Sequence, residues 1–548
     1  MKNLEVTEIW QRYEKCLSYI NRMALPERMN RCHRFYNGEQ WYGIKTGGED
    51  LPSLNFIKGL IKYKVTSVAQ NNMMAVFTAS DGSNEQENKV SEMLGSYFRR
   101  SWENGKLDSI CRKIIKDAAI QGDSYIFFGS GGDITEPQVL DNVNVFLSDE
   151  QNSDLQEQKF IILRERRFVE DIIKEAEENG ILKADIELIT SDTDMFTQIG
   201  EKAEVNTHGK CVSLLYMEKD DEGFVHISRS VKNLIYQPDT VLRSSAGSVL
   251  GGGLKSYPIV NFLWDEKKGS ARGLSEVEFL IPNQIEINKT IARRSIAVKQ
   301  TAFPMLAYAA NLINNPEDLD LIGGKIAVNN ANAQSIDQIV TYLRPANISS
   351  DAKNLSDELL QLSRELSGAG DSSIGNVDPT QASGAAIIAV RDQAQLPLND
   401  QIGRFMQLVE DLARMFIDML LAYNPKGITA DFEGKKERVS VDALEKMKIN
   451  IHVDVIKNSP YNLYATEESL ESFLKNGEIT FEEFVEALPE SGSIPKNRLR
   501  EILEKRKRVE NNTEVGEPAV DENKEITDEL TARKGMLLEA MEKMKARG

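Results

Sequence analysis

Apolar residues recur at helical spacing through much of this chain. Residues 4–22 place an apolar side chain at every third or fourth position, and residues 55–80 and 84–122 show a similar, mostly helical pattern. The clearest stripe falls within residues 398–423 and consists of Ile402, Phe405, Leu408, Val409, Leu412, Phe416, Met419 and Leu420. These patterns predict a protein built mainly from helices.

Strand-like patterns interrupt the helices. Residues 31–43 are aromatic and turn-rich, with a turn expected at Asn37-Gly38. Short β-type runs are expected at 124–128, 139–147, 160–163, 212–216, 223–228 and 259–264. A charged helix at 168–179 divides them. The predicted fold class is therefore α+β, mainly helical.

A long helix is expected from residue 275 to 300. Ser275 and Glu278 have the spacing of a capping box at its start, and Pro282 in the second turn can bend it without ending it. Its apolar residues are spread around the helix, so it must be covered on more than one side. They are Ile281, Ile285, Ile287, Ile291, Ile296 and Val298.

A compact insert and a second helix follow the long helix. Residues 302–309 and 325–328 are expected to be strands, and 316–321 a helical turn. The second helix is expected at 350–366. A glycine- and serine-rich loop then occupies 367–382, before a helical run at 385–395. The layout predicts a loop presented at the end of a helical stalk.

The C-terminal part is predicted to be helical after one alternating strand at 449–456. Thr466 is expected to cap a helix that ends at Asn476-Gly477, and Thr480 with Glu483 forms a second capping box. A basic helix is expected at 499–509 and an amphipathic helix at 526–545. The acidic stretch at 510–524 has the composition of a linker.

Length and charge limit the possible functions. A chain of 548 residues is too long for one core, and a net charge of −19 does not favour gripping DNA through bulk electrostatics. The four cysteines are scattered, as in a reducing compartment. We expect no signal peptide and no membrane helix, since no apolar run approaches the roughly 20 residues that one needs. The chain is expected to be made in a cytoplasm.

Motifs for catalysis and metal binding are missing from the sequence. It contains four histidines but no metalloprotease, nucleophile-elbow or phosphate-loop signature, so we expect no enzymatic activity, no catalytic residue and no cofactor. Asp192 and Asp194 resemble the start of a calcium loop without its glycine and final glutamate, so no metal is expected. Residues 251–253 are three glycines with no helix directly after them, which favours a surface loop.

The long helix carries a basic stripe. Its members are Lys289, Arg293, Arg294 and Lys299. They are either a solvated face balanced by nearby glutamates or a surface that packs on another subunit or faces DNA. Subunit packing is slightly favoured, since the helix has apolar residues on several sides.

Four motifs resemble the portal-protein family of tailed bacteriophages. RFYNGEQW at 34–41 is similar to the family's Phe-Tyr-x-Gly-[Asp/Glu]-Gln-Trp signature, and GDSYIFFG at 122–129 resembles its helix-to-strand step. GLSEVEFLIPNQIEINKTIA at 273–292 is similar to its stem helix. SGAGDSSIGN with QASGAAI, within 367–387, resembles its tunnel-loop region. The four motifs occur in the family's order, and residues 490–548 fall outside the likeness.

The resemblance implies a division of the chain into named parts. The wing would comprise 1–275 and 385–465, and the stem 276–300 and 350–366. The clip would be 301–349, the tunnel loop 367–384 and the crown 466–548. Such a protein would form a ring of twelve subunits at one capsid vertex. It would be found in the host cytoplasm during assembly and then in the virion.

The resemblance also implies partners. These would be the terminase large subunit, the major capsid protein and its scaffold, a head–tail adaptor, and double-stranded DNA that passes without sequence specificity. The loop's own residues suit such a conduit. Asp371 and Asp378 would repel phosphate, while Ser372, Ser373, Asn376 and Gln381 offer weak hydrogen bonds that release readily.

Two other functions stay open at this point. One is a cytoplasmic scaffold or adaptor that binds partners through its helices. The other is an enzyme whose site carries no recognised signature. A ring with an axial hole would distinguish the portal from the adaptor, and uptake of nucleotide or metal would favour the enzyme.

Overall fold

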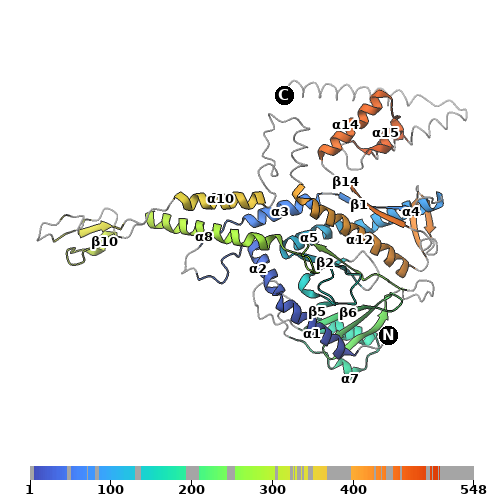
Figure 1. Ribbon diagram of the computed structural model, residues 1–548, viewed down its shortest axis with the longest axis horizontal. Coiled ribbons are helices and arrows are strands. Elements are labelled where there is room, and N and C mark those ends of the chain that lie inside the picture. Colours follow the sequence, from blue (N-terminus) through green and yellow to red (C-terminus); the bar gives the residue numbers. More distant parts are fainter. Residues whose placement is uncertain are drawn as a thin grey trace. The chain divides into compact units, whose positions relative to one another are not determined.

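The structure is a computed structural model that divides into two compact units, Met1–Lys457 and Asn458–Gly548. The residues it describes are 5–45, 51–70, 72–79, 85–129, 137–192, 209–242, 253–302, 306–320, 325, 327–329, 335, 339–343, 350–366, 396–424, 427–432, 435–439, 449–456, 460–488, 494–496, 498–500, 502–503 and 505. Each unit is described by itself. The elements are labelled in Figure 1.

Five helices come first in the larger unit: α1 (Val6–Arg22), α2 (Leu25–Asn37), α3 (Phe56–Ala69), α4 (Glu85–Asn104) and α5 (Leu107–Gln121). The turn-rich interpretation of 31–43 is wrong for residues up to Asn37, since Phe35 and Tyr36 lie buried on α2. The turn begins at Gly38. Its φ of +100° is open to glycine at little cost, and its N–H donates to the Arg34 carbonyl.

Residues 72–79 form a strand and not the expected helix. In β1 (Asn72–Ala79), Met73, Ala75 and Phe77 are buried and Val76 is exposed, which is the period of a strand. β1 pairs antiparallel with β14 (Ile449–Ile456), whose bounds match the prediction. The two strands are far apart in sequence, so the tertiary pairing decides the conformation of β1.

A five-stranded antiparallel sheet lies within the first unit. Its order is β4 (Val145–Leu147), β5 (Phe160–Phe168), β6 (Lys210–Lys219), β7 (Val225–Val231) and β8 (Leu234–Val241). On one face Ile162, Leu214 and Tyr216 pack with α1. On the other, Leu163 and Met217 join the largest core. Helices α6 (Val169–Glu178) and α7 (Lys183–Ile186) follow β5, so the expected charged helix is confirmed.

A three-stranded sheet lies at the centre of the main core. Its order is β3 (Pro137–Asp141), β2 (Asp123–Phe128) and β9 (Ile259–Leu263). All six residues of β2 are buried. The expected single strand at 139–147 is wrong in one respect, because a 3₁₀ turn, η1 (Asn142–Asn144), separates β3 from β4. β2 follows α5 directly, so this sheet is tied to the helical layer.

The long helix and its partner form an antiparallel pair. α8 (Glu276–Ala302) contains Pro282 within it, and α10 (Ser350–Leu366) packs against it with the bounds expected from sequence. Between them lie β10 (Leu306–Tyr308), η2 (Pro316–Asp320) and β11 (Val340–Tyr342), with β10 paired to β11. The expected strand at 325–328 is wrong as placed: Val328 makes only an isolated bridge to Ile313.

The rest of the first unit returns to the core. η3 (Leu396–Leu398) leads into α12 (Asn399–Tyr423), which buries the predicted apolar stripe. β12 (Ile428–Phe432) and β13 (Lys435–Val439) form an antiparallel pair. The loop expected at 367–382 and the helix expected at 385–395 lie outside the described residues.

The second unit contains two labelled helices, α14 (Pro460–Asn476) and α15 (Phe481–Ala487). Thr466 lies inside α14 and not at its start, so the expected cap is wrong. The capping box of Thr480 and Glu483 is confirmed, with both of its hydrogen bonds present. Buried Phe484, Val485 and Leu488 hold the unit together. The helix expected at 526–545 lies outside the described residues.

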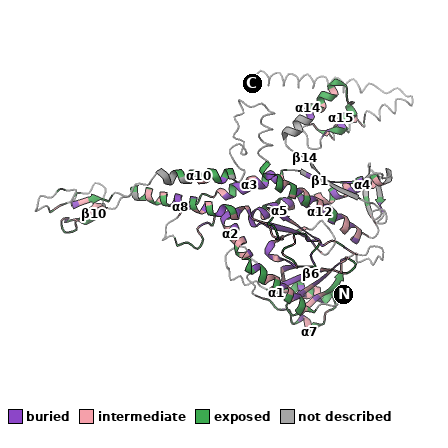
Figure 2. Ribbon diagram, in the orientation of Figure 1, coloured by how far each residue is buried: buried purple, intermediate pink, exposed green. Residues whose placement is uncertain are grey.

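The α+β, mainly helical fold class is confirmed. Figure 2 shows buried residues gathered in the sheets and in the helices beside them, whereas α8 and α10 carry many exposed positions. This helix pair therefore presents exposed faces to its surroundings.

Candidate functional site

The first turn of α8 is fixed to the body of the first unit. Ser275 Oγ accepts a hydrogen bond from the Glu278 N–H at 3.2 Å, as the capping-box prediction requires, and donates to the Ile120 carbonyl at 2.5 Å. Ser275 is itself buried. The serine therefore caps the helix and binds it to the end of α5.

Two ion pairs continue this attachment. Lys64 Nζ lies 2.7 Å from the Glu276 carboxylate, with both side chains nearly buried. Arg28 donates to both carboxylate oxygens of Glu278, at 2.9 and 2.6 Å, in the two-pronged geometry that suits a guanidinium. The carboxylate predicted to complete the capping box is therefore bound by a cation from α2. Both pairs place acidic side chains at the positive end of the helix.

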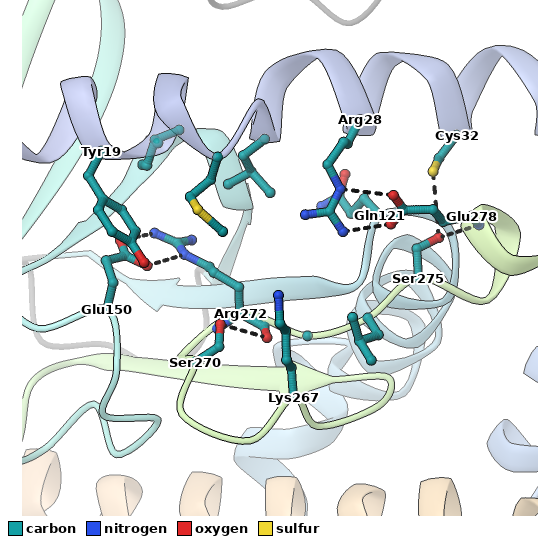
Figure 3. A pocket seen from close by; sticks show the side chains of 15 residues that line it. Tyr19, Arg28, Cys32, Gln121, Glu150, Lys267, Ser270, Arg272, Ser275 and Glu278 are labelled. Carbon is teal, nitrogen blue, oxygen red and sulfur yellow. Dashed lines mark hydrogen bonds and ion pairs between the residues drawn. The ribbon is translucent and has the colours of Figure 1, made fainter.

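A small pocket opens beside the Arg28–Glu278 pair, where α1 and α2 face the segment that leads into α8 (Figure 3). Cys32 lies in its wall, and burial raises the pKa of the Cys32 thiol to about 11. The thiol is therefore protonated near neutral pH and is a poor nucleophile. Two cations in the pocket wall already form ion pairs: Arg28 pairs with Glu278, and Arg272 pairs with Glu150.

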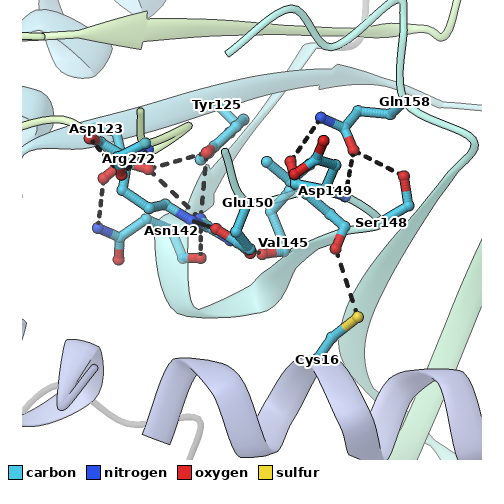
Figure 4. A network of polar contacts seen from close by, with 12 residues as sticks. Cys16, Asp123, Tyr125, Asn142, Val145, Ser148, Asp149, Glu150, Gln158 and Arg272 are labelled. Atoms are coloured by element: carbon cyan, nitrogen blue, oxygen red, sulfur yellow. Dashed lines mark hydrogen bonds and ion pairs between the residues drawn. The ribbon is translucent and has the colours of Figure 1, made fainter. Parts of the chain in front are cut away.

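Arg272 is the centre of a buried polar network just before α8 (Figure 4). Its guanidinium is bound by Glu150 at 2.8 and 2.7 Å and by Asp123 at 3.5 Å. It also donates to the Tyr125 hydroxyl at 3.2 Å and to two carbonyls, of Asn142 at 2.9 Å and Val145 at 2.7 Å. One side chain thus joins β2, η1, β4 and the loop after β4 to the start of the long helix.

Burial sets the protonation of this network. Burial raises the pKa of Asp123, and the positive charge of Arg272 opposes that rise. Burial alone would lower the pKa of Arg272, but Tyr125, Glu150 and Asp123 hold it well above its ordinary value. The guanidinium therefore keeps its charge inside the protein, because the surrounding oxygens replace water.

Two glycines let the chain approach itself closely at the same place. A Cβ on Gly122 would lie 2.6 Å from the Gly273 carbonyl oxygen, and a Cβ on Gly273 would overlap the Gly122 carbonyl. Gly122 also has a φ of +105°. No larger residue fits either position without moving the backbone, so the start of β2 lies directly against the entry to α8.

A cluster of buried amides holds the next turns of α8. Gln284 donates to the Leu54 carbonyl at 2.7 Å and to Asn288 Oδ1 at 2.9 Å. Asn288 in turn donates to the Gln40 side chain, and it accepts from the Leu54 N–H at 3.3 Å. Gln284, Asn288 and Gln40 are all buried. These hydrogen bonds tie α8 to the segment around Leu54 and to Gln40, although the buried Gln284 Oε1 has no hydrogen-bond partner of its own.

Three of the motif segments found in the sequence meet at this joint. Gln40 comes from 34–41, Gly122 and Asp123 from 122–129, and Ser275 from 273–292. No protein-family model matches the chain, and a search of the curated proteins finds no similar sequence. The motif residues and their positions therefore carry the functional argument. Their contacts attach the first turns of α8 to the rest of the first unit.

The predicted basic residues lie along α8 beyond this joint. Lys289 and Arg293 are exposed, and their four-residue separation puts them on one helical face. Lys289 pairs with Glu286 at 2.7 Å, as expected for a balanced solvated face. Arg294 is half-buried and Lys299 exposed, and both fall outside that spacing. The basic-stripe assignment stays a prediction.

The predicted tunnel-loop residues lie outside the described residues. They are Asp371, Ser372, Ser373, Asn376, Asp378 and Gln381. Their proposed role stays a prediction from the sequence. The structure describes the two helices on either side of the loop's sequence position, α10 before it and α12 after η3.

Of the residues that anchor α8, Ser275 and Glu278 were predicted from their capping-box spacing. Arg272 was not singled out, because its partners at 123 and 150 are more than a hundred positions away. Gln40, Gln284 and Asn288 did carry a signal. Gln40 belongs to the motif at 34–41, and Gln284 and Asn288 lie in the motif at 273–292.

The described residues contain neither a metal site nor a membrane-spanning helix. No group of three or more histidine, cysteine or acidic side chains there is arranged to hold a metal ion. None of the described helices combines the length and apolar character needed to cross a bilayer.

Proposed function

We propose that this chain is a portal protein of the tailed-bacteriophage type. The observation that carries the proposal is the antiparallel pair of α8 and α10, with a small two-stranded insert between them and three family-like motifs at the foot of α8. A helix fixed so firmly at one end suits a stalk that must keep its direction under load. The resemblance supplies the name, and the anchored helix pair supports it.

In this proposal the copies close into a ring, with twelve subunits expected from the resemblance. The parts 1–275 and 385–465 form the wing, 276–300 and 350–366 the stem, and 301–349 the clip. The tunnel loop at 367–384 faces the channel, and the crown covers 466–548. The ring occupies one capsid vertex of the virion after assembly in the host cytoplasm.

The partners follow from that position. A terminase large subunit docks during packaging and supplies ATP hydrolysis, so the portal itself needs no catalytic residue or cofactor. The major capsid protein and scaffold surround the ring, and a head–tail adaptor replaces the terminase later. Double-stranded DNA passes through without sequence specificity.

Charge supports the role of a conduit. The chain carries a net −19, and a wall of the same sign as DNA repels phosphate instead of binding it. A ring repeats that charge in every copy. A channel of this kind lets a polyanion slide, because few cationic groups hold it in place.

Electron microscopy of the purified full-length protein tests this function. The expected image is a ring with an axial hole. Monomers or filaments in the images would instead favour the scaffold or adaptor. In a separate binding measurement, stoichiometric uptake of nucleotide or metal would favour an enzyme. A second preparation at raised salt serves as the control for nonspecific aggregation.

A further inference from the structure

The exposed face of α8 is a regular stripe. Its positions follow alternating steps of three and four residues, which is the spacing of a helix that packs on another helix. They are Phe279, Pro282, Glu286, Lys289, Arg293 and Ile296. Phe279 is 61% exposed and Ile296 38%. The stripe therefore has apolar residues at its two ends, and between them Lys289 paired with Glu286 and the further cation Arg293.

The exposed face of α10 has the opposite charge. Asp357, Glu358 and Glu365 are exposed on it beside one cation, Arg364, and Gln361 donates to Glu365 at 2.8 Å. Leu362, 43% exposed, borders the same face. The buried Ser363 lies on the other side of the helix, where it accepts from Asn283 of α8 at 3.0 Å. The acidic face thus points away from the α8 of its own chain.

The stripe on α8 and the acidic face of α10 form no ion pairs with each other within one chain, among the described residues. Among the described residues, Arg293 and Arg294 have no carboxylate partner, and Asp357 and Glu358 have no cationic partner. The helices meet instead through Asn283 and the small Ser363. Complementary charges are therefore left on two separate outward surfaces of the same helix pair.

We propose that the α8 stripe of one copy packs against the acidic face of α10 in the next copy. The inference rests on the proposed ring and names the surfaces that close it. A head-to-tail contact between two different faces of identical chains generates a ring when the rotation closes. Each copy offers one basic and one acidic face, so the same pairing repeats around the ring.

The levels of the charges along the helices fit this arrangement. Lys289 lies six residues after Asn283, and Asp357 lies six residues before Ser363 on the antiparallel partner. The two charges are therefore at the same level along the helix pair. A rotation about an axis that runs along the pair preserves that level, so Lys289 of one copy meets Asp357 of the next. Arg293 lies about one turn further along α8, and its long side chain reaches back towards the same acidic face.

The apolar ends of the stripe favour a protein partner over DNA. Phe279 and Ile296 gain nothing from contact with a phosphate backbone, whereas they lose exposed apolar area when another helix covers them. An interface with apolar residues and a few paired charges is typical of specific association between proteins.

Charge reversal with rescue tests the pairing. K289E/R293E and D357K/E358K should each weaken ring assembly about tenfold or more, measured as the protein concentration at which rings form, because like charges then face each other. The four changes together should restore assembly. K232E/K268E, at two exposed lysines outside the helix pair, changes the net charge as much as K289E/R293E does and should leave assembly unchanged.

The outcomes separate this inference from the proposed function. A wild-type protein that never forms rings would overturn both. Wild-type rings that tolerate either reversal as well as they tolerate K232E/K268E would overturn only the pairing. Rings that survive K289E/R293E but fail to package DNA would assign the α8 stripe to DNA. A combined variant that assembles no better than either double variant would also reject the pairing.

Discussion

Arg272 decides the attachment of α8 at the scale of single residues. Its guanidinium is almost fully buried and is the cation nearest both Asp123 and Glu150. Removing it strands two carboxylates in the interior, which is far more costly than removing both members of a pair. Arg272 is important because it neutralises Asp123 and Glu150. A local sequence pattern cannot predict ion pairs with residues so far away in the chain.

We predict that Arg272→Met lowers the free energy of unfolding of the full-length protein by about 3–5 kcal/mol. Arg28→Met is the matched control. Its pair with Glu278 is about one-third exposed, and its loss should cost about 1 kcal/mol or less. Urea unfolding followed by circular dichroism measures both. Equal losses in the two variants would contradict the role given to Arg272.

The buried carboxyl of Asp123 predicts a pH dependence. Because burial raises its pKa above the ordinary 3.8, the folded protein still holds the proton at pH values where the unfolded chain has released it. The contribution of Asp123 to stability therefore falls as pH rises from about 3.8 through the folded pKa.

Asp123→Asn removes this titration. Relative to the wild type, the variant should become steadily more stable as pH rises from about 4 towards 7. Urea midpoints of both proteins at a series of pH values give the comparison. A difference that stays constant across the series would show that Asp123 does not titrate in this way.

At the scale of elements, periodicity predicted those segments whose own pattern of apolar and polar residues is regular. The bounds of α10 and β14 match the sequence prediction, and α12 buries the predicted stripe. β1 was missed because Met and Ala within it also favour helices, and only its pairing with β14 makes it a strand. β8 was missed because Pro238 and its charged neighbours suit the exposed edge of a sheet.

Close backbone packing at the foot of α8 gives a prediction for that element. Gly273→Ala should destabilise the protein by about 1–3 kcal/mol, because its Cβ would overlap the Gly122 carbonyl. Gly403→Ala in α12 is the control. Nothing lies within 4 Å of its new methyl group, and it should gain about 0.5–1 kcal/mol from helix propensity. Thermal or urea unfolding compares the pair, and similar losses in both would contradict the close approach.

The loop after α10 is predicted from its sequence to serve passage and not assembly. Deleting residues 371–376 should leave rings intact while impairing DNA packaging or retention, because a glycine- and serine-rich loop contributes few core contacts. Ring imaging together with a packaging assay tests this. Failure of the deletion variant to assemble would mean that the loop is structural.

At the scale of the whole molecule, an acidic chain presents a pair of antiparallel helices that the proposed ring would repeat. The sequence carried the order of the motifs and the helix–insert–helix layout. The contacts that attach the start of α8 could not be predicted from the sequence. They join segments near residues 40, 64, 123, 150 and 272, which only folding brings together. This joint fixes the first turns of α8, and in the proposed ring identical helix pairs with complementary faces close around an axis.

The mass of the purified full-length protein in solution tests this account most directly. Twelve copies of a 61.5 kDa chain give a particle of about 740 kDa, and light scattering across a range of protein and salt concentrations should find it. A protein that stays at 61.5 kDa under every condition would contradict the ring, and the channel along with it.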